Sequence, residues 1–524
     1  MTIIMMLMLL LWAVVVPLVS FWAWRTLDWV WLTPRRIERE LRRQGLGGNH
    51  YRILYGDAKD NVRLSKDVRS RPLPLYCHDI GPRVLPLFHK AIKDHGKTSF
   101  TWLGPFPRVT LMNPESVKEV LSNKFGHFMR PRTTPLAKFL VQGLLSHEGE
   151  KWAKHRRIIN PAFHLEKLKL MYPAFSASCG ELIRRWDKMI PDESCLELDV
   201  FPEIQNVTLD VISRTAFGSS YEEGRRIFEL LTEQTRLVIP AAQNVYIPGY
   251  RFLPTPMNQK RSQVDKEMKR ILRDMIEKRE RAMRKGESSK KNDLLGILLE
   301  SNMKEAEEVQ GKKSKNRGMT TEDVIEECKL FYLAGQETTA VLLTWTMILL
   351  GMYPNWQAKA REEVLHVFGK NTPDMDGLSR LKIVTMILYE VLRLYPPGSW
   401  LLREVRKPTE VGGITYPPGV TLLLPILLIH HDTEFWGEDA KEFKPERFAE
   451  GISKASKVAG AFFPFGGGPR ICIGQNFALI EAKIGLSMIL QHFSFELSPS
   501  YIHAPCLVFS VQPQHGAQLR LGKL

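Results

Sequence analysis

The chain has 524 residues, of which 44% are hydrophobic and 25% are charged, as in an ordinary globular protein. Lysine and arginine number 73 against 57 aspartates and glutamates, and the net charge of +16 suits an acidic protein partner or an anionic membrane surface. No zinc-ligand spacing, RNA-recognition signature or continuous basic stripe supports a nucleic-acid-binding function. Six cysteines without close pairs exclude a disulfide scaffold and indicate a reducing compartment. Length alone predicts about three domains, but no low-complexity linker divides the chain, so one large unit is equally open.

Residues 1–24 contain no charged side chain and are predicted to form a membrane anchor. A helix of that length runs about 36 Å, which is enough to cross a bilayer core. Amphipathic aromatic side chains mark a membrane interface, and tryptophans gather toward one end, at Trp22, Trp24, Trp29 and Trp31. Five arginines follow between residues 34 and 43, and the positive-inside rule places that end in the cytosol.

A cleaved secretory signal peptide is the alternative for this segment. The apolar run is long for one, a basic start is missing, and bulky residues 21–24 stand where a small-residue cleavage site is expected. We therefore expect an uncleaved anchor at 1–24, a basic membrane-proximal linker at 25–50 and the remaining folded domain at 51–524. No transit peptide or retrieval tetrapeptide is evident, so the expected location is the endoplasmic reticulum membrane, single-pass, with the large domain cytosolic.

The domain after the linker is predicted to be mostly α with a minor β portion. Residues 99–104 and 108–112 predict a small hairpin, and helical periodicity dominates from about residue 150. Short strand signals return after about residue 409 and continue in the C-terminal tail. The densely charged stretch 259–293 predicts an exposed helix, and 285–291 and 311–318 predict solvated loops.

A long helix is predicted from Thr320 to about Leu350. Thr320 stands three residues before an acid, as a helix N-cap does, and nothing except Gly335 interrupts the run that follows. In its middle, an acid and an alcohol follow that glycine, at Glu337 and Thr338. Such a sequence can open the helical hydrogen-bond ladder and admit water; threonines that back-bond to helix carbonyls are the alternative.

The most informative segment is residues 465–474, Phe-Gly-Gly-Gly-Pro-Arg-Ile-Cys-Ile-Gly. Glycines let a backbone pass close to a flat macrocycle, and the N–H groups of such a turn can stabilise the negative charge of a thiolate. The segment therefore predicts a haem whose iron is held by Cys472, with Arg470 on a propionate and Phe465 packed against the ring. A glycine-rich hairpin with a buried structural cysteine is the alternative.

Other residues are assigned to the same haem. Trp152 and Arg156 lie one helical turn apart, so both are candidates to bind one propionate by hydrogen bond and charge. Arg403 is a third propionate candidate. With haem present, Glu337 and Thr338 become candidates for a groove that holds O₂ and for a proton route to it.

Further motifs are expected to serve the structure. Glu390 and Arg393 share one helix face, and with Arg447 they are expected to form a buried triad that braces the cysteine loop. Surface pairs of this kind are common and contribute little. The histidines His155, His430 and His431 lack a partner spacing for zinc and are expected to be structural. No GxGxxG or phosphate loop is present, so the chain is not expected to bind its own nicotinamide or flavin.

Four motifs, at residues 334–339, 390–393, 445–448 and 465–474, resemble in this order the cytochrome P-450 superfamily of haem-thiolate monooxygenases. The resemblance implies a triangular, mostly helical fold with haem b between the long helix and the cysteine loop. It implies O₂ as co-substrate and electrons from NADPH through the membrane-bound NADPH–cytochrome P-450 reductase. Residues 51–524 would then be the haem-thiolate catalytic domain, anchored in membrane lipid.

Longer stretches are similar to a plant subfamily that contains secologanin synthase and several triterpenoid oxidases: residues 152–171, 246–255, 324–345 and 499–505. That similarity implies a hydrophobic terpenoid substrate, either a triterpenoid or an iridoid. Multi-step oxidation or oxidative C–C cleavage of an iridoid, or oxidation of a diterpenoid hormone, are the alternatives. One departure is that the proline-rich hinge usual after the anchor is missing.

By analogy with the family, substrate-pocket positions are expected at residues 123–140, 237–244, 398–402 and 508–509 and at Val341. Two other functions stay open at this point. A haem-thiolate isomerase or dehydratase would use a ready-made peroxide and no reductase, and such proteins typically lack an acid–alcohol pair like Glu337 and Thr338. A haem or gas sensor would need neither a substrate-sized cavity nor an anchor.

Overall fold

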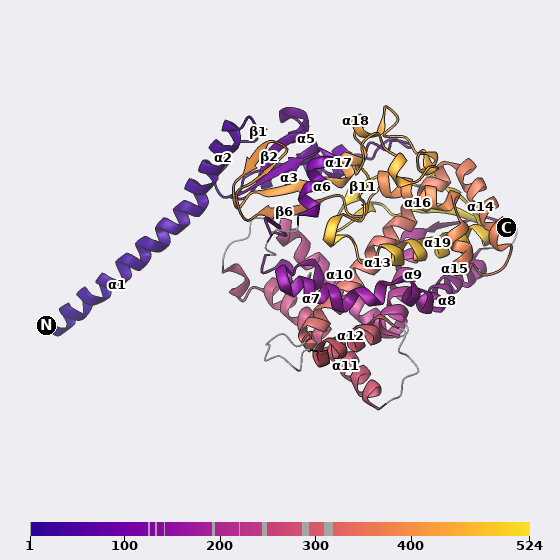
Figure 1. The fold of residues 1–524 in the computed structure, drawn as a ribbon, viewed down its shortest axis with the longest axis horizontal. Helices are drawn as coiled ribbons and strands as arrows, with labels where there is room; N and C mark the ends of the chain where they lie inside the picture. Colours follow the sequence, from indigo (N-terminus) through magenta and orange to yellow (C-terminus); the bar gives the residue numbers. More distant parts are fainter. Residues whose placement is uncertain are drawn as a thin grey trace.

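Helices make up most of the computed structural model and short strands a minor part, as the sequence predicts. The structure describes residues 2–123, 126–131, 134–140, 142–190, 194–218, 221–243, 249–285, 293–308 and 318–524. Figure 1 shows one long N-terminal helix that projects away from a body of helices, with a small sheet where the two meet. The C-terminus lies at the opposite end of the body.

The projecting helix is α1 (Thr2–Leu27). It continues through a π-helical turn, η1 (Asp28–Leu32), into α2 (Thr33–Arg43). The segment predicted as a linker is therefore helical over most of its length. Ile37 and Leu41 of α2 are buried against the body, so the base of the projecting helix is fixed to the domain.

The main sheet has the strand order β1-β2-β3-β9-β6-β4. Its strands are β1 (Gly47–Gly48), β2 (Thr98–Leu103), β3 (Phe106–Leu111), β9 (Thr421–Leu424), β6 (Leu401–Val405) and β4 (Phe128–Met129). The hairpin β2–β3 is the one that the sequence predicts, with bounds shifted by one or two residues. Arg108 of β3 pairs with Thr101 on one side and with Thr421 on the other.

Smaller sheets follow the strand signals near the C-terminus. They are β10–β13–β5, the hairpin β11–β12 and the hairpin β7–β8. Their bounds are β5 (Leu196–Asp199), β7 (Thr409–Val411), β8 (Ile414–Tyr416), β10 (Phe493–Leu497), β11 (Pro505–Leu507), β12 (Val511–Pro513) and β13 (Gln518–Lys523).

The remaining α-helices build the body. Before residue 126 they are α3 (Ala58–Arg69), α4 (Gly81–Val84), α5 (Pro86–His95) and α6 (Pro114–Ser122). The central ones are α7 (Gly149–Ile159), α8 (Leu165–Met189), α9 (Val200–Phe217), α10 (Tyr221–Gln243), α11 (Pro256–Arg284) and α12 (Leu294–Glu308). The later ones are α14 (Pro354–Phe368), α15 (Met375–Arg380), α16 (Ile383–Leu394), α17 (Ile426–His430), α18 (Thr433–Trp436) and α19 (Gln475–His492).

The charged helix α11 is only partly exposed, because Val264, Met268, Leu272 and Ile276 form a buried stripe along it. Spacings of three and four residues place such side chains on one helix face. Most of the two predicted loops, 286–291 and 311–317, lies outside the described residues.

The long central helix is α13 (Thr321–Met352). Thr320 caps it as predicted, since its Oγ1 accepts the Asp323 N–H at 3.1 Å while the Asp323 carboxylate accepts the Thr320 N–H. α13 has a stretch apolar enough to cross a membrane, but 83% of that stretch is buried inside the protein. It packs between α9 and α19, so it is the core helix of the body.

Candidate active site

The cysteine loop lies between the short 3₁₀ turn η8 (Gly468–Arg470) and the start of α19. The Cys472 N–H donates to the Phe465 carbonyl at 2.9 Å, which closes the loop. Gly468 has φ of +64°, and a Cβ there would collide with the Leu121 carbonyl of α6. Only glycine fits that position, so the sequence of the loop holds the cysteine in one place.

Cys472 faces a cavity of about 1760 Å³. Burial raises the pKa of its thiol, while the Gly474 N–H and the Arg156 guanidinium act in the opposite direction and favour the thiolate. The predicted site residues that line the same cavity are Trp152, Arg156, Thr338, Arg403, Phe465 and Arg470. The structure thus gathers side chains from four separate segments around one sulfur.

Among the described residues, the arginines beside the cysteine loop have few negatively charged partners. Arg470 pairs with Glu148 at 2.6 Å and stands over the Trp152 ring at 4.5 Å. Arg156 Nη1 donates to the Ile471 carbonyl at 3.0 Å. Arg403 Nη1 donates to the neighbouring Leu402 carbonyl, and burial lowers the pKa of Arg403 to about 10.

Arg130, which the sequence reasoning did not single out, belongs to the same group. Burial and the nearby Arg403 and Arg470 cations lower its pKa to about 9, opposed by Glu148. Its Nε is buried without a hydrogen-bond partner among the described residues. A buried cation cluster with one carboxylate lacks anions. The two propionates of a haem would supply them, so these residues fit that group.

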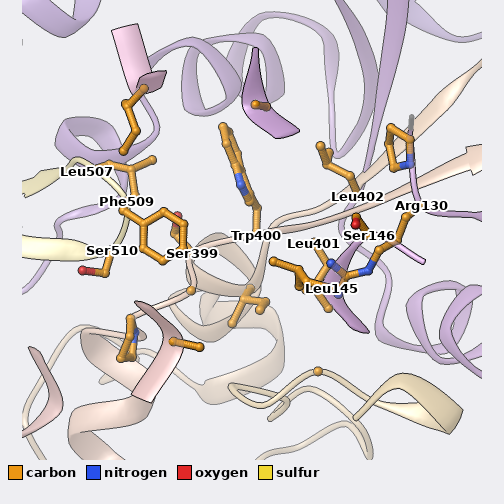
Figure 2. Close-up of a pocket in the computed structure, with 18 of the residues that line it drawn as sticks. Arg130, Leu145, Ser146, Ser399, Trp400, Leu401, Leu402, Leu507, Phe509 and Ser510 are labelled. Atoms are coloured by element: carbon orange, nitrogen blue, oxygen red, sulfur yellow. The ribbon is translucent and has the colours of Figure 1, made fainter. Parts of the chain in front are cut away.

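Figure 2 shows part of the cavity, where Trp400 stands between Leu507, Phe509 and Ser510 on one side and Arg130, Leu145 and Leu402 on the other. The expected positions 398–402 and 508–509 all line the cavity. From the expected range 237–244, Val238 and Ile239 line the cavity. From the expected range 123–140, the lining residues are Arg130, Pro131, Thr134, Pro135, Ala137 and Leu140. Residues 124, 125, 132, 133 and 244 lie outside the described residues.

The prediction for Val341 is wrong. Val341 is fully buried, and the cavity is lined by the next residue, Leu342. Successive helical residues point about 100° apart, so a shift of one position turns a side chain from the cavity into the core.

Thr338 and Glu337 lie at different places relative to the cavity. Thr338 lines it, and its Oγ1 donates to the Ala334 carbonyl at 2.7 Å. Glu337 is buried behind the wall, where its Oε1 accepts hydrogen bonds from Ser510 Oγ at 2.6 Å and from the Gln512 amide. Burial raises the pKa of the Glu337 carboxyl, and these two donors oppose that rise. Sequence reasoning missed Ser510 and Gln512 because nothing local marks them.

Glu390, Arg393 and Arg447 come together as the motifs suggest. The Glu390 and Arg393 side chains are fully buried and joined at 2.7 Å, and Arg447 Nε lies 3.5 Å from Glu390 Oε1. Arg393 Nη1 also donates to the His430 carbonyl at 2.8 Å, and His430 Nε2 accepts the Phe463 N–H at 3.2 Å. The cluster therefore connects through His430 to the chain just before the cysteine loop.

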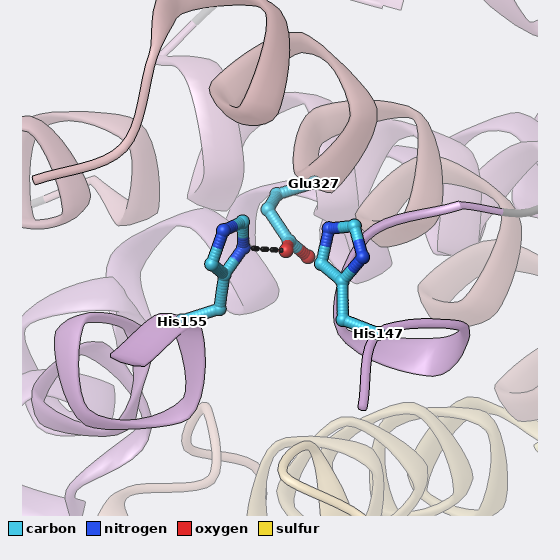
Figure 3. Close-up of side chains that lie close together, drawn as sticks. All are labelled: His147, His155 and Glu327. Carbon is cyan, nitrogen blue, oxygen red and sulfur yellow. Dashed lines mark hydrogen bonds and ion pairs between the residues drawn. The ribbon is translucent and has the colours of Figure 1, made fainter. Parts of the chain in front are cut away.

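His155 has close partners that its sequence spacing does not reveal. Figure 3 shows it with His147 and Glu327, and their candidate ligand atoms lie within 4.8 Å of one another. His155 Nδ1 lies 2.6 Å from Glu327 Oε1, and Glu327 Oε2 accepts the Leu144 N–H at 2.9 Å. Both carboxylate oxygens are thus engaged, and the cluster ties α7 and the turn before it to α13.

Comparison with known proteins gives full-length matches. A profile of the family described as "Cytochrome P450" matches residues 73–519. Cytochrome P450 CYP72A616 of Paris polyphylla is 64% identical over 95% of this chain and 95% of that protein. Cytochrome P450 72A397 of Kalopanax septemlobus is 56% identical over 96% of each chain, and Cytochrome P450 72A15 of Arabidopsis thaliana is 54% identical over 98% of each.

Among solved structures, the retinoic acid-bound cyanobacterial CYP120A1 shares the fold with a TM-score of 0.74. It is 21% identical and covers 91% of this chain and 99% of its own. Fold and sequence agree that this is a haem-thiolate oxidoreductase: the chain belongs to the cytochrome P-450 family. Within that family its relatives are plant CYP72A proteins, and like them it is a monooxygenase that carries haem.

Proposed function

We propose that this protein inserts one oxygen atom from O₂ into a C–H bond of a plant terpenoid, with electrons from NADPH through the membrane-bound reductase. The observation that carries the proposal is the cavity of about 1760 Å³ that Cys472 faces. Its walls include Phe88, Trp400, Leu402 and Phe509, so it suits a large apolar substrate. Of the two classes that the plant subfamily implies, a triterpenoid meets that description, and an iridoid is the smaller alternative.

The roles of the residues follow from their places. Haem held by the Cys472 thiolate supplies the oxygen-activating chemistry, to which the thiolate contributes electron density. Arg130, Arg403 and Arg470 would hold the propionates by charge-assisted hydrogen bonds. Phe465 would pack against the ring from the side of the cysteine loop.

Proton supply is assigned to Thr338 and Glu337. The Thr338 hydroxyl lines the cavity, where it would hold water or O₂ in hydrogen-bond reach. Glu337 is adjacent in the chain, and its burial favours the protonated form. A carboxyl held in its protonated form can act as a general acid.

The N-terminal helix supports a membrane location. α1 projects from the body, and its described side chains, such as Leu11, Trp22 and Trp24, are exposed. We propose that α1 is the single-pass anchor in the endoplasmic reticulum membrane, with the body on the cytosolic side beside the reductase. Arginine follows the apolar run in α2, which supports that orientation.

Turnover by the full-length protein in membranes tests the function. Microsomes with the protein, the reductase and NADPH are supplied with a panel of triterpenoids, iridoids and diterpenoids, and products are identified by mass spectrometry. A product that is larger by one oxygen atom and depends on both NADPH and reductase is expected. A product formed without either would contradict the proposal and favour isomerase or dehydratase chemistry. Repeated oxidation or ring opening would appear as further mass changes.

A further inference from the structure

The cluster of His147, His155 and Glu327 has no part in the chemistry assigned above, and its side chains are those of a metal site. One candidate ligand atom from each residue lies within 4.8 Å of the other two. Figure 3 shows the two imidazole rings on either side of the Glu327 carboxylate. Two histidines and one carboxylate are a ligand set that zinc takes in proteins.

Three elements bring these side chains together. His155 belongs to α7 and Glu327 to α13, and both are fully buried. His147 lies in the turn between the 3₁₀ helix η3 (Gly143–Leu145) and α7, where its N–H donates to the Gly143 carbonyl at 3.0 Å. His147 is partly exposed, so an ion can reach the cluster from the side of this turn.

The imidazole of His147 has a nitrogen that the protein does not use. Its Nε2 is buried and has no hydrogen-bond partner among the described residues. Burial lowers the pKa of His147 to about 4, so the ring is neutral near pH 7 and keeps one lone pair. Buried polar atoms nearly always have a partner, and a metal ion would be one for this ring.

His155 has one engaged nitrogen and one unused nitrogen. Its Nδ1 lies 2.6 Å from Glu327 Oε1, so one proton lies between these two atoms. Its Nε2 is buried without a partner in the described part of the chain, and Asp323 Oδ1 lies 3.9 Å from it. A neutral imidazole can carry its proton on either nitrogen. With the proton on Nε2, both Nδ1 and Glu327 Oε1 are free to bind a cation.

Asp323 lies where that proton needs an acceptor. A histidine that binds a metal usually donates its other N–H to a carboxylate, which fixes the ring and its tautomer. Asp323 and Glu327 are four residues apart on α13 and therefore share one helix face. The same helix thus offers a ligand, Glu327, and the carboxylate that would orient a second ligand, His155.

The charges around the cluster favour a cation. Glu327 and Asp323 are two acids, and Lys151, which pairs with Asp323 at 2.7 Å, brings one positive charge. Arg470 is also near, but it has its own partner in Glu148 at 2.6 Å. With both acids ionised, one negative charge remains, so a divalent ion is attracted to this place.

The cluster needs a small closure to hold zinc. Zn–N and Zn–O bonds of about 2.0–2.1 Å place tetrahedral ligand atoms about 3.3 Å apart, so atoms within 4.8 Å must approach by about 1.5 Å or less. The turn with His147 is the exposed side of the cluster and would make this approach. Arg470 Nη2 donates to the His147 carbonyl at 2.9 Å, so the turn also supports an arginine of the cysteine loop.

We propose that His147, His155 and Glu327 bind one Zn²⁺ ion, with Asp323 as the hydrogen-bond acceptor that orients His155. Water from the exposed side takes the fourth position. The ion joins the turn before α7 to α13 and so fixes the backbone that Arg470 contacts. This site does not include Cys472 and does not depend on the proposed terpenoid oxidation.

Metal binding by the full-length holoenzyme tests the site. The protein is placed in phosphatidylcholine nanodiscs, with no polyhistidine tag on protein or scaffold, and Zn²⁺ is titrated in competition with a chromophoric chelator. One equivalent of Zn²⁺ is expected to bind and to raise the midpoint of thermal unfolding, because a ligand of the native state stabilises it. Co²⁺ in place of Zn²⁺ is expected to add the strong visible bands of a tetrahedral nitrogen and oxygen site.

Two variants and one control locate the ion. His147→Gln removes a ligand but keeps the backbone carbonyl that Arg470 uses. Asp323→Asn leaves all three ligands and is expected to weaken Zn²⁺ binding about ten- to a hundredfold, and His147→Gln at least as much. His515→Gln removes an exposed histidine from the turn between β12 and β13 and is expected to leave the affinity unchanged. The CO spectrum of each reduced variant verifies that haem and fold are intact.

Three outcomes would overturn the site. The first is that the wild type binds no more Zn²⁺ than His147→Gln, and the second is an equal loss of affinity in His515→Gln. The third is a near-ultraviolet thiolate-to-Co²⁺ band, which would place the ion on a cysteine such as the exposed Cys195. Turnover of the terpenoid panel enters none of these measurements, so the zinc site and the proposed function are tested separately.

Discussion

Ser510 Oγ lies 2.6 Å from Glu337 Oε1, so the loop between β11 and β12 holds the acid of the central helix. Ser510 also lines the cavity, next to Phe509. A substrate that presses on this loop therefore acts on the hydrogen bond that orients Glu337. With the role in proton supply that we propose for Glu337, this contact would couple substrate binding to proton supply.

Ser510→Ala removes one of the two donors to Glu337 and is expected to misorient its carboxyl. Product formed per NADPH consumed should fall about tenfold, the equivalent of one hydrogen bond to a charged or acidic group, and peroxide should rise. Ser487→Ala is the control, because Ser487 is a buried serine of α19 away from the cavity wall. Unchanged coupling in Ser510→Ala would remove this contact from the proton route.

Thr338→Ala is expected to waste NADPH as peroxide while haem binding survives, because the hydroxyl that faces the cavity is lost. Thr346 provides a matched control: its Oγ1 back-bonds to the Leu342 carbonyl at 2.7 Å, as Thr338 does to Ala334, but Thr346 is buried away from the cavity. NADPH, peroxide and product are measured together. An equal effect of Thr346→Ala would show that helix back-bonding, and not the position at the cavity, is what matters.

The parts of the site that the sequence predicted are those that a short contiguous segment defines. The turn around Cys472 and the N-cap at Thr320 depend on residues within a few positions of one another, and both have the expected form. The sequence also predicts the helix that carries Thr338. It does not predict which side chains of that helix face the cavity: Val341 is expected there, but Leu342 lines the cavity.

The parts that the sequence missed depend on contacts between distant segments. Ser510 lies 173 positions from Glu337, and no local periodicity marks either as a partner of the other. Arg130 follows a two-residue strand, too short for a pattern. His155 likewise contacts Glu327 of a distant helix, which its spacing in the sequence does not reveal.

The buried pair Glu390–Arg393 is expected to be essential for stability. Glu390→Gln leaves the Arg393 cation fully buried beside a neutral group, and loss of one partner of a buried pair costs about 3–5 kcal/mol. Thermal unfolding and loss of the thiolate-type CO spectrum measure the effect. Glu229→Gln removes an exposed partner of Arg225 and is expected to leave the unfolding midpoint unchanged. An equally mild effect at Glu390 would show that the triad does not brace the cysteine loop.

Deletion of residues 1–24 is expected to release the protein from membranes, because it removes most of the exposed apolar helix α1. The deleted and full-length proteins are compared by sedimentation of microsomes with and without high salt. The CO spectrum should be the same in both, since the body does not enclose α1. Continued tight pelleting of the shortened protein would show that a second surface attaches it.

Reduced protein with CO is expected to show the strongly red-shifted Soret band of a thiolate-ligated haem, because Cys472 faces the cavity between arginines that suit the propionates. Cys472→His is expected to shift the band to that of a histidine-ligated haem and to abolish turnover. Cys195→Ser is the control, since Cys195 is exposed at the surface near β5, and it should leave the band unchanged. A histidine-type band in the wild type would disprove the assignment of Cys472 as the iron ligand.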